Sequence, residues 1–494
     1  MRQKKSNIQD FKLFTALFIA LNLVFCFYQT TFFWGNHDWD WIKGTDQLLQ
    51  LNTGMFEARY AKFILNVFLF GGHILPILNN VVAFALLALG AVLTTHYWQL
   101  KNFGDKLLVG LFISLSPYIL GWLYFPINIL GNFAAVALVA GGLLLFETKK
   151  SALSYGVSFI CFLLALGVYP SVMEMMIILI LFKHILCQPA QFKEFLRPFI
   201  LPVLALITFK LMLIFLSAQQ LIAGDYYNLQ TVSVAELVKR VPDVIKLSFE
   251  QIILPLPFMN VSFKIISLLI VLTAFFSLRN IYAGVLFVGA FFATALSSWL
   301  TATPVDTAFM PRVNFYGVNF FIAGAMAVLL LEKGFRRNLG LLFAGLLILQ
   351  SITADCYAEK VWFFGKRAEE NVISRIVGRV ENEENFKPRV PVVAGELSLR
   401  PRYYHDFYLI KSPYLLDHSF MVRHIPSGMF NFYMAENLFH KTSVISTMSD
   451  ELYRFLSTAE KPYPHENSLF VDDDYVIMLL TKDGIKAIQA QLPR

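Results

Sequence analysis

Long apolar runs separated by short polar segments fill the chain as far as Cys356. A helix needs about 20 apolar residues to cross the roughly 30 Å hydrocarbon layer of a membrane. About eleven runs reach or approach this length. They start at Leu13, Pro76, Leu107, Ile127, Leu153, Ser171, Phe199, Ser262, Ile281, Phe315 and Leu339. We therefore predict a polytopic α-helical membrane protein with about eleven spanning helices.

Two stretches between these runs have a different pattern. The stretch from 59 to 75 is apolar but short, and Gly71, Gly72 and His73 interrupt it, so we expect a juxtamembrane or re-entrant helix. In the loop from about 217 to 261, apolar residues recur at helical spacing over Val234–Ile245, which predicts an amphipathic helix.

The tail that begins at Tyr357 is richer in Arg, Glu, Asn, Tyr and Pro than the rest of the chain. The segments Arg389–Gly395 and Asp474–Leu480 have the composition of β-strands, and Ser446–Thr458 has that of a helix. We expect a transmembrane domain over residues 1–356 and a small α/β domain over 357–494.

Composition supports a membrane protein. Hydrophobic residues make up 57% of the chain and charged residues 15%, whereas soluble domains carry roughly 25% charged residues. The mean hydropathy is +0.58. The net charge of +7 would suggest nucleic acid in a soluble protein, but here the basic residues lie between apolar runs, so we expect no nucleic-acid partner. The four cysteines lack ligand-type spacing, which argues against a disulfide framework.

The basic residues also predict the orientation, because cytoplasmic loops of membrane proteins are enriched in Lys and Arg. With the N-terminus inside, every short inner segment is basic. The inner set is Arg2, Lys4, Lys5, Lys12, Lys101, Lys106, Lys149, Lys150, Lys183, Lys193, Arg197, Arg279, Lys333, Arg336 and Arg337. The outer set is spread over longer loops and comprises Lys43, Arg59, Lys62, Lys239, Arg240, Lys246, Lys264 and Arg312. We predict that the N-terminus is cytoplasmic and that the tail is extracytoplasmic. We also expect the run that starts at Leu13 to be retained as the first spanning helix.

The first outer loop contains two carboxylates among tryptophans, in Trp34-Gly-Asn-His-Asp-Trp-Asp-Trp41. Tryptophans are ordinary interface anchors, and Asp38 and Asp40 could be ordinary solvated charges. The alternative is that the large rings desolvate these acids and increase their basicity, which suits a general base. We assign no metal or cofactor. His37 with the two acids is the combination that would hold a divalent ion, although a lone loop histidine is usually no ligand.

Further charged residues fall on the same predicted face. Arg59 follows Glu57 by two residues, and Arg312 lies just before the tenth run. Lys210 lies inside the seventh run, and Glu174 lies near the outer end of the sixth, after Tyr169 and Pro170. Intramembrane charges are costly and are functional candidates, although Lys210 could instead snorkel to the headgroups. Arg and Lys side chains suit a lipid-linked phosphate.

The order of these features resembles the GtrII-type bacterial glucosyltransferases, which modify O-antigen and belong to the GT-C class of membrane glycosyltransferases. The matching features are Asp38 and Asp40, Glu57-Ala-Arg-Tyr60, Leu75-Pro76, Tyr169-Pro170, Pro311-Arg312-Val313, a Val-Val-x-Gly strand and Asp474-Tyr-Val-Ile477. The family's acids are typically adjacent, whereas Trp39 separates them here, which leaves open which acid is the base. Ala58 also replaces the family's glycine before the arginine.

The resemblance implies that the protein moves a sugar, glucose in that family, from a polyprenyl-phosphate donor to a polysaccharide or lipopolysaccharide acceptor such as O-antigen. The reaction would occur on the outer face of the bacterial inner membrane. Asp38 or Asp40 would act as the catalytic base. The substrate-binding candidates are Trp39, Glu57, Arg59, Tyr169, Glu174, Lys210 and Arg312.

Other functions fit the same pattern of spans. A multi-span transporter or flippase of lipid-linked sugars would also contain buried charges, but transporters often have two halves of related hydropathy, and this sequence does not. A polysaccharide polymerase or ligase would share the donor chemistry and use a longer glycan. A simple membrane anchor for the tail would not need so many spans.

Overall fold

The structure is a computed structural model. It describes residues 2–31, 60–71, 73, 75–123, 126–148, 151–187, 192–219, 233–253, 261–300, 315–381, 390–394, 448–462, 465–471, 475–479, 482–490 and 492. The described residues fall into two compact units, which we call the membrane unit (as far as Ala358) and the C-terminal unit (from Glu359). The domain boundary expected at 356/357 stays a prediction.

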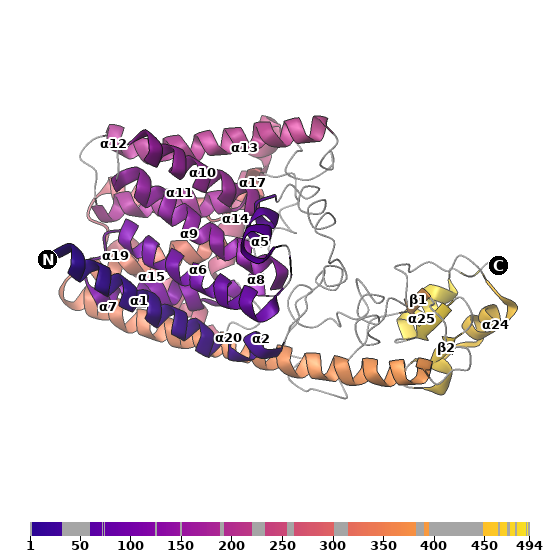
Figure 1. The fold of residues 1–494 in the computed structure, drawn as a ribbon. Helices are drawn as coiled ribbons and strands as arrows, with labels where there is room; N and C mark the ends of the chain where they lie inside the picture. Colours follow the sequence, from indigo (N-terminus) through magenta and orange to yellow (C-terminus); the bar gives the residue numbers. More distant parts are fainter. Residues whose placement is uncertain are drawn as a thin grey trace. The chain divides into compact units, whose positions relative to one another are not determined.

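The membrane unit is a bundle of helices, drawn from indigo to orange in Figure 1. Its first elements are α1 (Arg2–Val24), α2 (Cys26–Thr31), α5 (Tyr60–Phe70), α6 (Pro76–Tyr97), α7 (Phe103–Leu115), η1 (Pro117–Ile119), α8 (Leu120–Leu123), α9 (Pro126–Thr148) and α10 (Ala152–Val168). The next are α11 (Val172–Cys187), α12 (Phe192–Leu196), η2 (Arg197–Phe199), α13 (Ile200–Ala218), α14 (Val234–Ile253) and α15 (Val261–Phe276). The last are α16 (Ile281–Ala293), α17 (Leu296–Leu300), η4 (Phe315–Asn319), α19 (Phe320–Leu331) and the part of α20 (Gly334–Glu381) as far as Ala358.

Within the described ranges, five helical segments are long and apolar enough to cross a membrane. They are Ile77–Tyr97, Phe103–Leu123, Asn128–Thr148, Glu194–Ala218 and Gly334–Lys360. The chain therefore has the fold of a helical membrane protein. Helices also occupy the other predicted runs, but several are shorter than a full span: α10, α15 and α16 have 17, 16 and 13 residues. The count of eleven spans stays a prediction.

The centre of the bundle is α19, in which every side chain from Phe320 to Leu330 is buried. It contacts α7, α11 and α15, while α6 packs along α9 and α10 packs against both α9 and α13. The α6–α9 contact depends on Gly90, since a Cβ there would lie 2.9 Å from the backbone nitrogen of Ala137. At the periphery, α13 exposes Leu211 and Phe215, as expected for a helix that faces lipid.

Ion pairs join helix ends at one end of the bundle. Arg337 of α20 binds Asp105 of α7 at 2.7 Å, and Lys106 binds Asp10 of α1 at 2.8 Å. Lys183 of α11 lies 3.5 Å from Glu147 of α9. We call this the inner end and the opposite end the outer end, after the predicted topology. Pairing neutralises these cations where the helices are packed closely.

The C-terminal unit contains a three-stranded sheet of order β1-β3-β2. Strand β1 (Val390–Ala394) is parallel to β3 (Tyr475–Leu479), and β2 (Leu469–Val471) is antiparallel to it. The other elements are α24 (Asp450–Thr458), η6 (Glu466–Ser468) and α25 (Lys482–Gln489). Strands β1 and β3 and helix α24 lie inside the segments predicted to form strands and helix.

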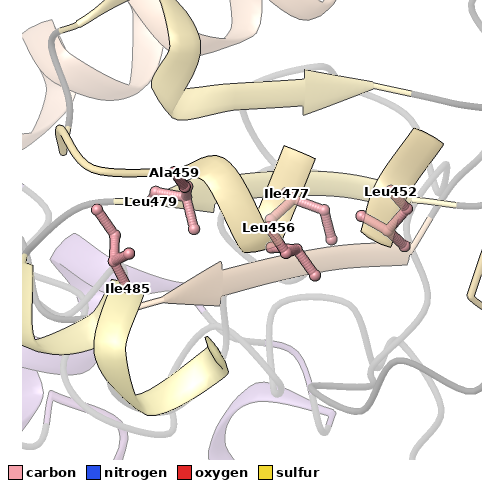
Figure 2. Close-up of a cluster of buried hydrophobic side chains, with 6 residues drawn as sticks. All are labelled: Leu452, Leu456, Ala459, Ile477, Leu479 and Ile485. Atoms are coloured by element: carbon pink, nitrogen blue, oxygen red, sulfur yellow. The ribbon is translucent and has the colours of Figure 1, made fainter. Parts of the chain in front are cut away.

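Helices α24 and α25 pack against the sheet through a small apolar core, shown in Figure 2. Leu452 and Leu456 lie one helical turn apart on α24, and Ile477 and Leu479 lie on the same face of β3 because alternate strand residues share a face. The Ser449 hydroxyl accepts a hydrogen bond from the Leu452 N–H and caps α24. The location of this unit outside the cytoplasm stays a prediction.

Candidate functional site

Most of the residues proposed to carry chemistry lie outside the described residues. This group comprises His37, Asp38, Trp39, Asp40, Glu57, Arg59 and Arg312. The structure describes the other three, Tyr169, Glu174 and Lys210. The site is therefore built from what surrounds these three.

Tyr169, which is partly buried, and Glu174 belong to a group of otherwise buried polar and aromatic residues that we call the outer cluster. The cluster consists of Trp122, Asn132, Tyr169, Glu174, Ser297, Tyr316 and Gly317. They come from the end of α8, the start of α9, the α10–α11 turn, the start of α11, α17 and η4. The ion pairs of the inner end lie at the start of α7 and at the ends of α9 and α11. The cluster lies at the opposite ends of these helices, so it is at the outer end of the bundle.

Glu174 is the centre of this cluster, and its side chain is fully buried. Its Oε1 atom accepts a 2.8 Å hydrogen bond from the backbone N–H of Ser297 and another from the Ser297 hydroxyl. Helix α16 ends at Ala293, and after a turn α17 begins at Leu296. The N–H of Ser297 therefore lies in the first turn of α17, where N–H groups have no acceptor within the helix. The Glu174 carboxylate provides the acceptor.

The second oxygen of Glu174 faces η4, where Gly317 makes a close approach possible. A Cβ on Gly317 would lie 2.8 Å from Glu174 Oε2 and 2.6 Å from the Thr294 carbonyl oxygen. Among the described residues, Oε2 has no hydrogen-bond partner. The segment η4 is one turn of π-helix, a rare form that is frequent at functional sites. A buried carboxylate with one unpaired oxygen is costly in an apolar bundle, which makes it a functional candidate.

Three aromatic rings of the outer cluster pack on one another. Trp122 packs edge-on against Tyr169, with ring centroids 5.0 Å apart. The ring centroids of Trp122 and Tyr316 are 5.8 Å apart. The Tyr316 hydroxyl donates a 3.0 Å hydrogen bond to the Asn132 carbonyl oxygen. The Trp122 indole N–H and the NH₂ group of the Asn132 side chain have no partner in the described part of the chain. The outer end of the bundle thus combines aromatic faces with unpaired donors and a carboxylate.

Helix α5 packs beside this region. The Tyr60 hydroxyl donates a 3.1 Å hydrogen bond to the Leu163 carbonyl oxygen of α10, and Lys62 donates a 2.8 Å bond to the Asn128 side chain of α9. The predicted short helix is present, and the chain turns at Gly71, where φ is +62°. Arg59 immediately precedes Tyr60 in the chain. Whether α5 re-enters the membrane stays open.

Lys210 lies near the middle of α13, which packs against α10. Its side chain is half-exposed. This position is compatible both with binding a lipid phosphate and with snorkelling, so the structure leaves both interpretations of Lys210 in place.

No metal site is found in the described ranges, where no group of three or more His, Cys, Asp or Glu side chains comes together. The combination of His37, Asp38 and Asp40 lies outside those ranges.

Sequence reasoning missed Trp122, Asn132, Ser297, Tyr316 and Gly317. Ser297 is 123 positions from Glu174, and no local pattern connects the two. The available signal was the Phe-Tyr-Gly-Val-Asn segment at 315–319, whose polar residues interrupt the start of an apolar run.

The fold and this site define a helical membrane protein with a buried polar and aromatic cluster at one end of its bundle. No protein-family profile, curated protein or solved structure matches the chain.

Proposed function

We propose that the protein is a membrane glycosyltransferase that moves a sugar, glucose according to the family resemblance, from a polyprenyl-phosphate donor to a glycan acceptor such as O-antigen. The observation that carries the proposal is the outer cluster, which holds the buried Glu174 and a group of three packed aromatic rings at one end of an apolar bundle. The proposal puts the reaction at the outer face of a bacterial inner membrane.

The segments with the other proposed site residues adjoin this end along the chain. Residues 32–59 connect α2 to α5, and residues 301–314 connect α17 to η4. Ser297 of α17 and Gly317 of η4 both contact Glu174, and Tyr60 of α5 bonds to α10. The described residues next to Arg59 and Arg312 in the chain thus lie near this end of the bundle, which supports including these two arginines in the proposed site. The acids of the first loop are included because of the family resemblance.

In the proposed reaction, Asp38, or Asp40 as second choice, accepts the proton of the acceptor hydroxyl. The acceptor oxygen forms a bond to the anomeric carbon of the sugar, and the bond from that carbon to the lipid phosphate oxygen breaks. The phosphate leaves with both bonding electrons, and its charge is stabilised by Arg59, Arg312 and Lys210. Trp39 and Tyr169 are suited to pack on a sugar ring, while Glu57 and Glu174 are suited to bind its hydroxyls.

The direct test is to incubate the full-length protein, purified in nanodiscs, with polyprenyl-phosphate-glucose and isolated O-antigen lipid. We expect release of polyprenyl phosphate together with glucosylation of the acceptor, and neither without acceptor. The double variant Asp38→Asn and Asp40→Asn is the control. If the wild-type protein and this variant release equal amounts of lipid phosphate, the proposal is wrong.

A transporter or flippase of lipid-linked sugars is the second candidate, and the buried Glu174 favours it, because intramembrane carboxylates also mark ion and substrate pathways. The two candidates are separated with sealed proteoliposomes that contain a labelled polyprenyl-phosphate-sugar. A transporter moves the intact lipid between leaflets and leaves the sugar–phosphate bond unbroken. A transferase breaks that bond on the side where acceptor is present.

A further inference from the structure

Helix α14 (Val234–Ile253) has three distinct faces, and one of them packs on the bundle. Val244 and Leu247 are buried with Ala295 of the α16–α17 turn, and Trp299 of α17 packs against this group. The Trp299 indole N–H also donates a 2.8 Å hydrogen bond to the Leu237 carbonyl oxygen. This face fixes α14 to the bundle.

The second face is apolar and exposed. Val238, Val241, Ile245 and Phe249 recur at spacings of three and four residues, so they form one stripe along the helix. Val238 is 65% exposed and Phe249 is 51% exposed. A stripe of four large apolar side chains on an amphipathic helix is costly in water and requires an apolar partner.

The third face is charged. Lys239, Asp243, Lys246 and Glu250 lie along it, and Lys246 pairs with Glu250 at 3.6 Å. At 100° per residue, the centres of the three faces are roughly 120° apart. The helix carries three acids and three bases, since Glu236 and Arg240 add one of each. Because these charges balance, the exposed apolar stripe, rather than attraction to anionic groups, must account for any membrane binding.

The position of α14 along the bundle is set by its contacts. The ring of Phe249 lies 4.8 Å from that of Phe291, near the last residue of α16, and α14 also contacts α15. Helix α14 therefore lies at the outer end of the bundle. Within it, Pro242 has no N–H, which deprives the Val238 carbonyl of its helical donor. At the membrane surface, water and headgroups can satisfy such a carbonyl, whereas in the hydrocarbon centre other protein groups would have to do so.

We propose that α14 is an interfacial helix that inserts its stripe of Val238, Val241, Ile245 and Phe249 into the lipid leaflet at the outer end of the bundle. The charged face of α14 is then in water, and the first face, with Val244 and Leu247, anchors the helix to the α16–α17 turn and α17. The partner is the acyl-chain region of a lipid surface, and no anionic headgroup is required. This inference does not depend on the proposed glycosyltransferase activity.

The test is spin-label accessibility in the full-length protein in phosphatidylcholine nanodiscs. The four free cysteines, Cys26, Cys161, Cys187 and Cys356, are first replaced by Ser or Ala. Single cysteines are then placed at Val238, Val241 and Ile245 on the stripe and at Lys239, Asp243 and Lys246 on the charged face. Leu211 of α13, 61% exposed near the middle of a predicted span, is the reference for lipid.

We expect labels on the stripe to show high accessibility to oxygen and low accessibility to a water-soluble nickel complex, as at Leu211. On the charged face the oxygen-to-nickel ratio should fall several-fold. Low accessibility of the stripe to both reagents would mean that a second copy or another segment covers it, and high nickel accessibility would mean that it is in water. Either result would overturn the proposal.

Discussion

At the scale of single residues, Glu174 shows how a bundle of largely apolar helices holds a carboxylate. The two hydrogen bonds from Ser297 satisfy one oxygen, and they also bind α11 to α17 across the break after α16. Gly317 lets η4 approach the other oxygen. Three segments that are distant in sequence therefore depend on one side chain.

Removing the Glu174 side chain should destabilise the protein. Glu174→Ala leaves the buried N–H and hydroxyl of Ser297 without an acceptor, at a cost of ~1–3 kcal/mol for each buried unpaired group. Glu174→Gln keeps an acceptor oxygen for Ser297 and should melt closer to wild type. Thermal unfolding in detergent, followed by circular dichroism, measures the difference. An alanine variant as stable as the glutamine variant would show that Glu174 does not hold α17.

Gly317→Ala should also destabilise the bundle, because the new methyl group would lie 2.6 Å from the Thr294 carbonyl oxygen. Overpacking of this kind costs ~1–3 kcal/mol. The matched control is Gly345→Ala in α20, where nothing lies within 4 Å of the added Cβ. This control should be neutral or slightly stabilising, since alanine is the better helix former. Equal melting temperatures for the two variants would argue against a tight η4 contact.

Asp38→Asn and Asp40→Asn separate the two candidate bases under the proposed function. The change keeps the side-chain shape and removes the proton acceptor. We expect a loss of transfer rate of ~10²–10⁴-fold for the true base and a smaller loss for the other acid. Donor binding, measured separately, should be retained in both. Normal transfer rates in both single variants would rule out the mechanism proposed above.

At the scale of elements, the ion pairs at the inner end connect helices that lie far apart in the chain. The Asp105–Arg337 pair spans 232 positions, from the first turn of α7 to the first turn of α20. Asp105 has 4% of its side chain exposed, whereas Arg337 has 28%. A carboxylate in the first turn of a helix is also stabilised by the helix dipole.

A double-mutant cycle on Asp105→Asn and Arg337→Gln should give a coupling energy of ~1–2 kcal/mol, because residues paired in one network are typically coupled by ~0.5–3 kcal/mol. The matched control is the pair of Arg279 and Glu332, where the atoms are 3.9 Å apart and Arg279 is 68% exposed. Exposed pairs contribute ~0–1 kcal/mol, so this cycle should show little coupling. Denaturant or thermal unfolding supplies the stabilities of the wild type, the four single variants and the two double variants. Similar coupling in both cycles would contradict a special role for the buried pair.

At the scale of the whole molecule, the predicted topology requires an odd number of crossings between a cytoplasmic N-terminus and an extracytoplasmic tail. A reporter enzyme that is active only outside the cytoplasm, fused after Arg494, should be active. The same reporter fused within the inner segment at Lys149 and Lys150 should be inactive. An active reporter at the inner fusion, or an inactive reporter after Arg494, would overturn both the topology and the proposed reaction at the outer face.

The sequence by itself determined the helical fold class and the positions of most of the long helices. A long apolar segment in lipid must satisfy every backbone N–H and carbonyl internally, and the helix is the local structure that does so. The predicted positions of α5, α14 and α24, and of strands β1 and β3, follow likewise from local spacing of apolar residues. Two helices run past their predicted ends: α14 extends to Ile253 rather than Ile245, and α20 continues through the predicted domain boundary at 356/357 to Glu381.

Tertiary structure alone decided which residues meet. Glu174 and Tyr169 were candidates because of their residue types, but their neighbours Ser297, Gly317 and Trp122 come from other helices, and nothing local in the sequence specifies such pairings. Packing also set the helix lengths: α16 stops at Ala293 and α17 restarts at Leu296, where Glu174 supplies the acceptor that the new helix start needs. Apolar patterning specifies that a helix is buried. The partner of each buried polar atom depends on which helices pack side by side, and that is a property of the whole bundle.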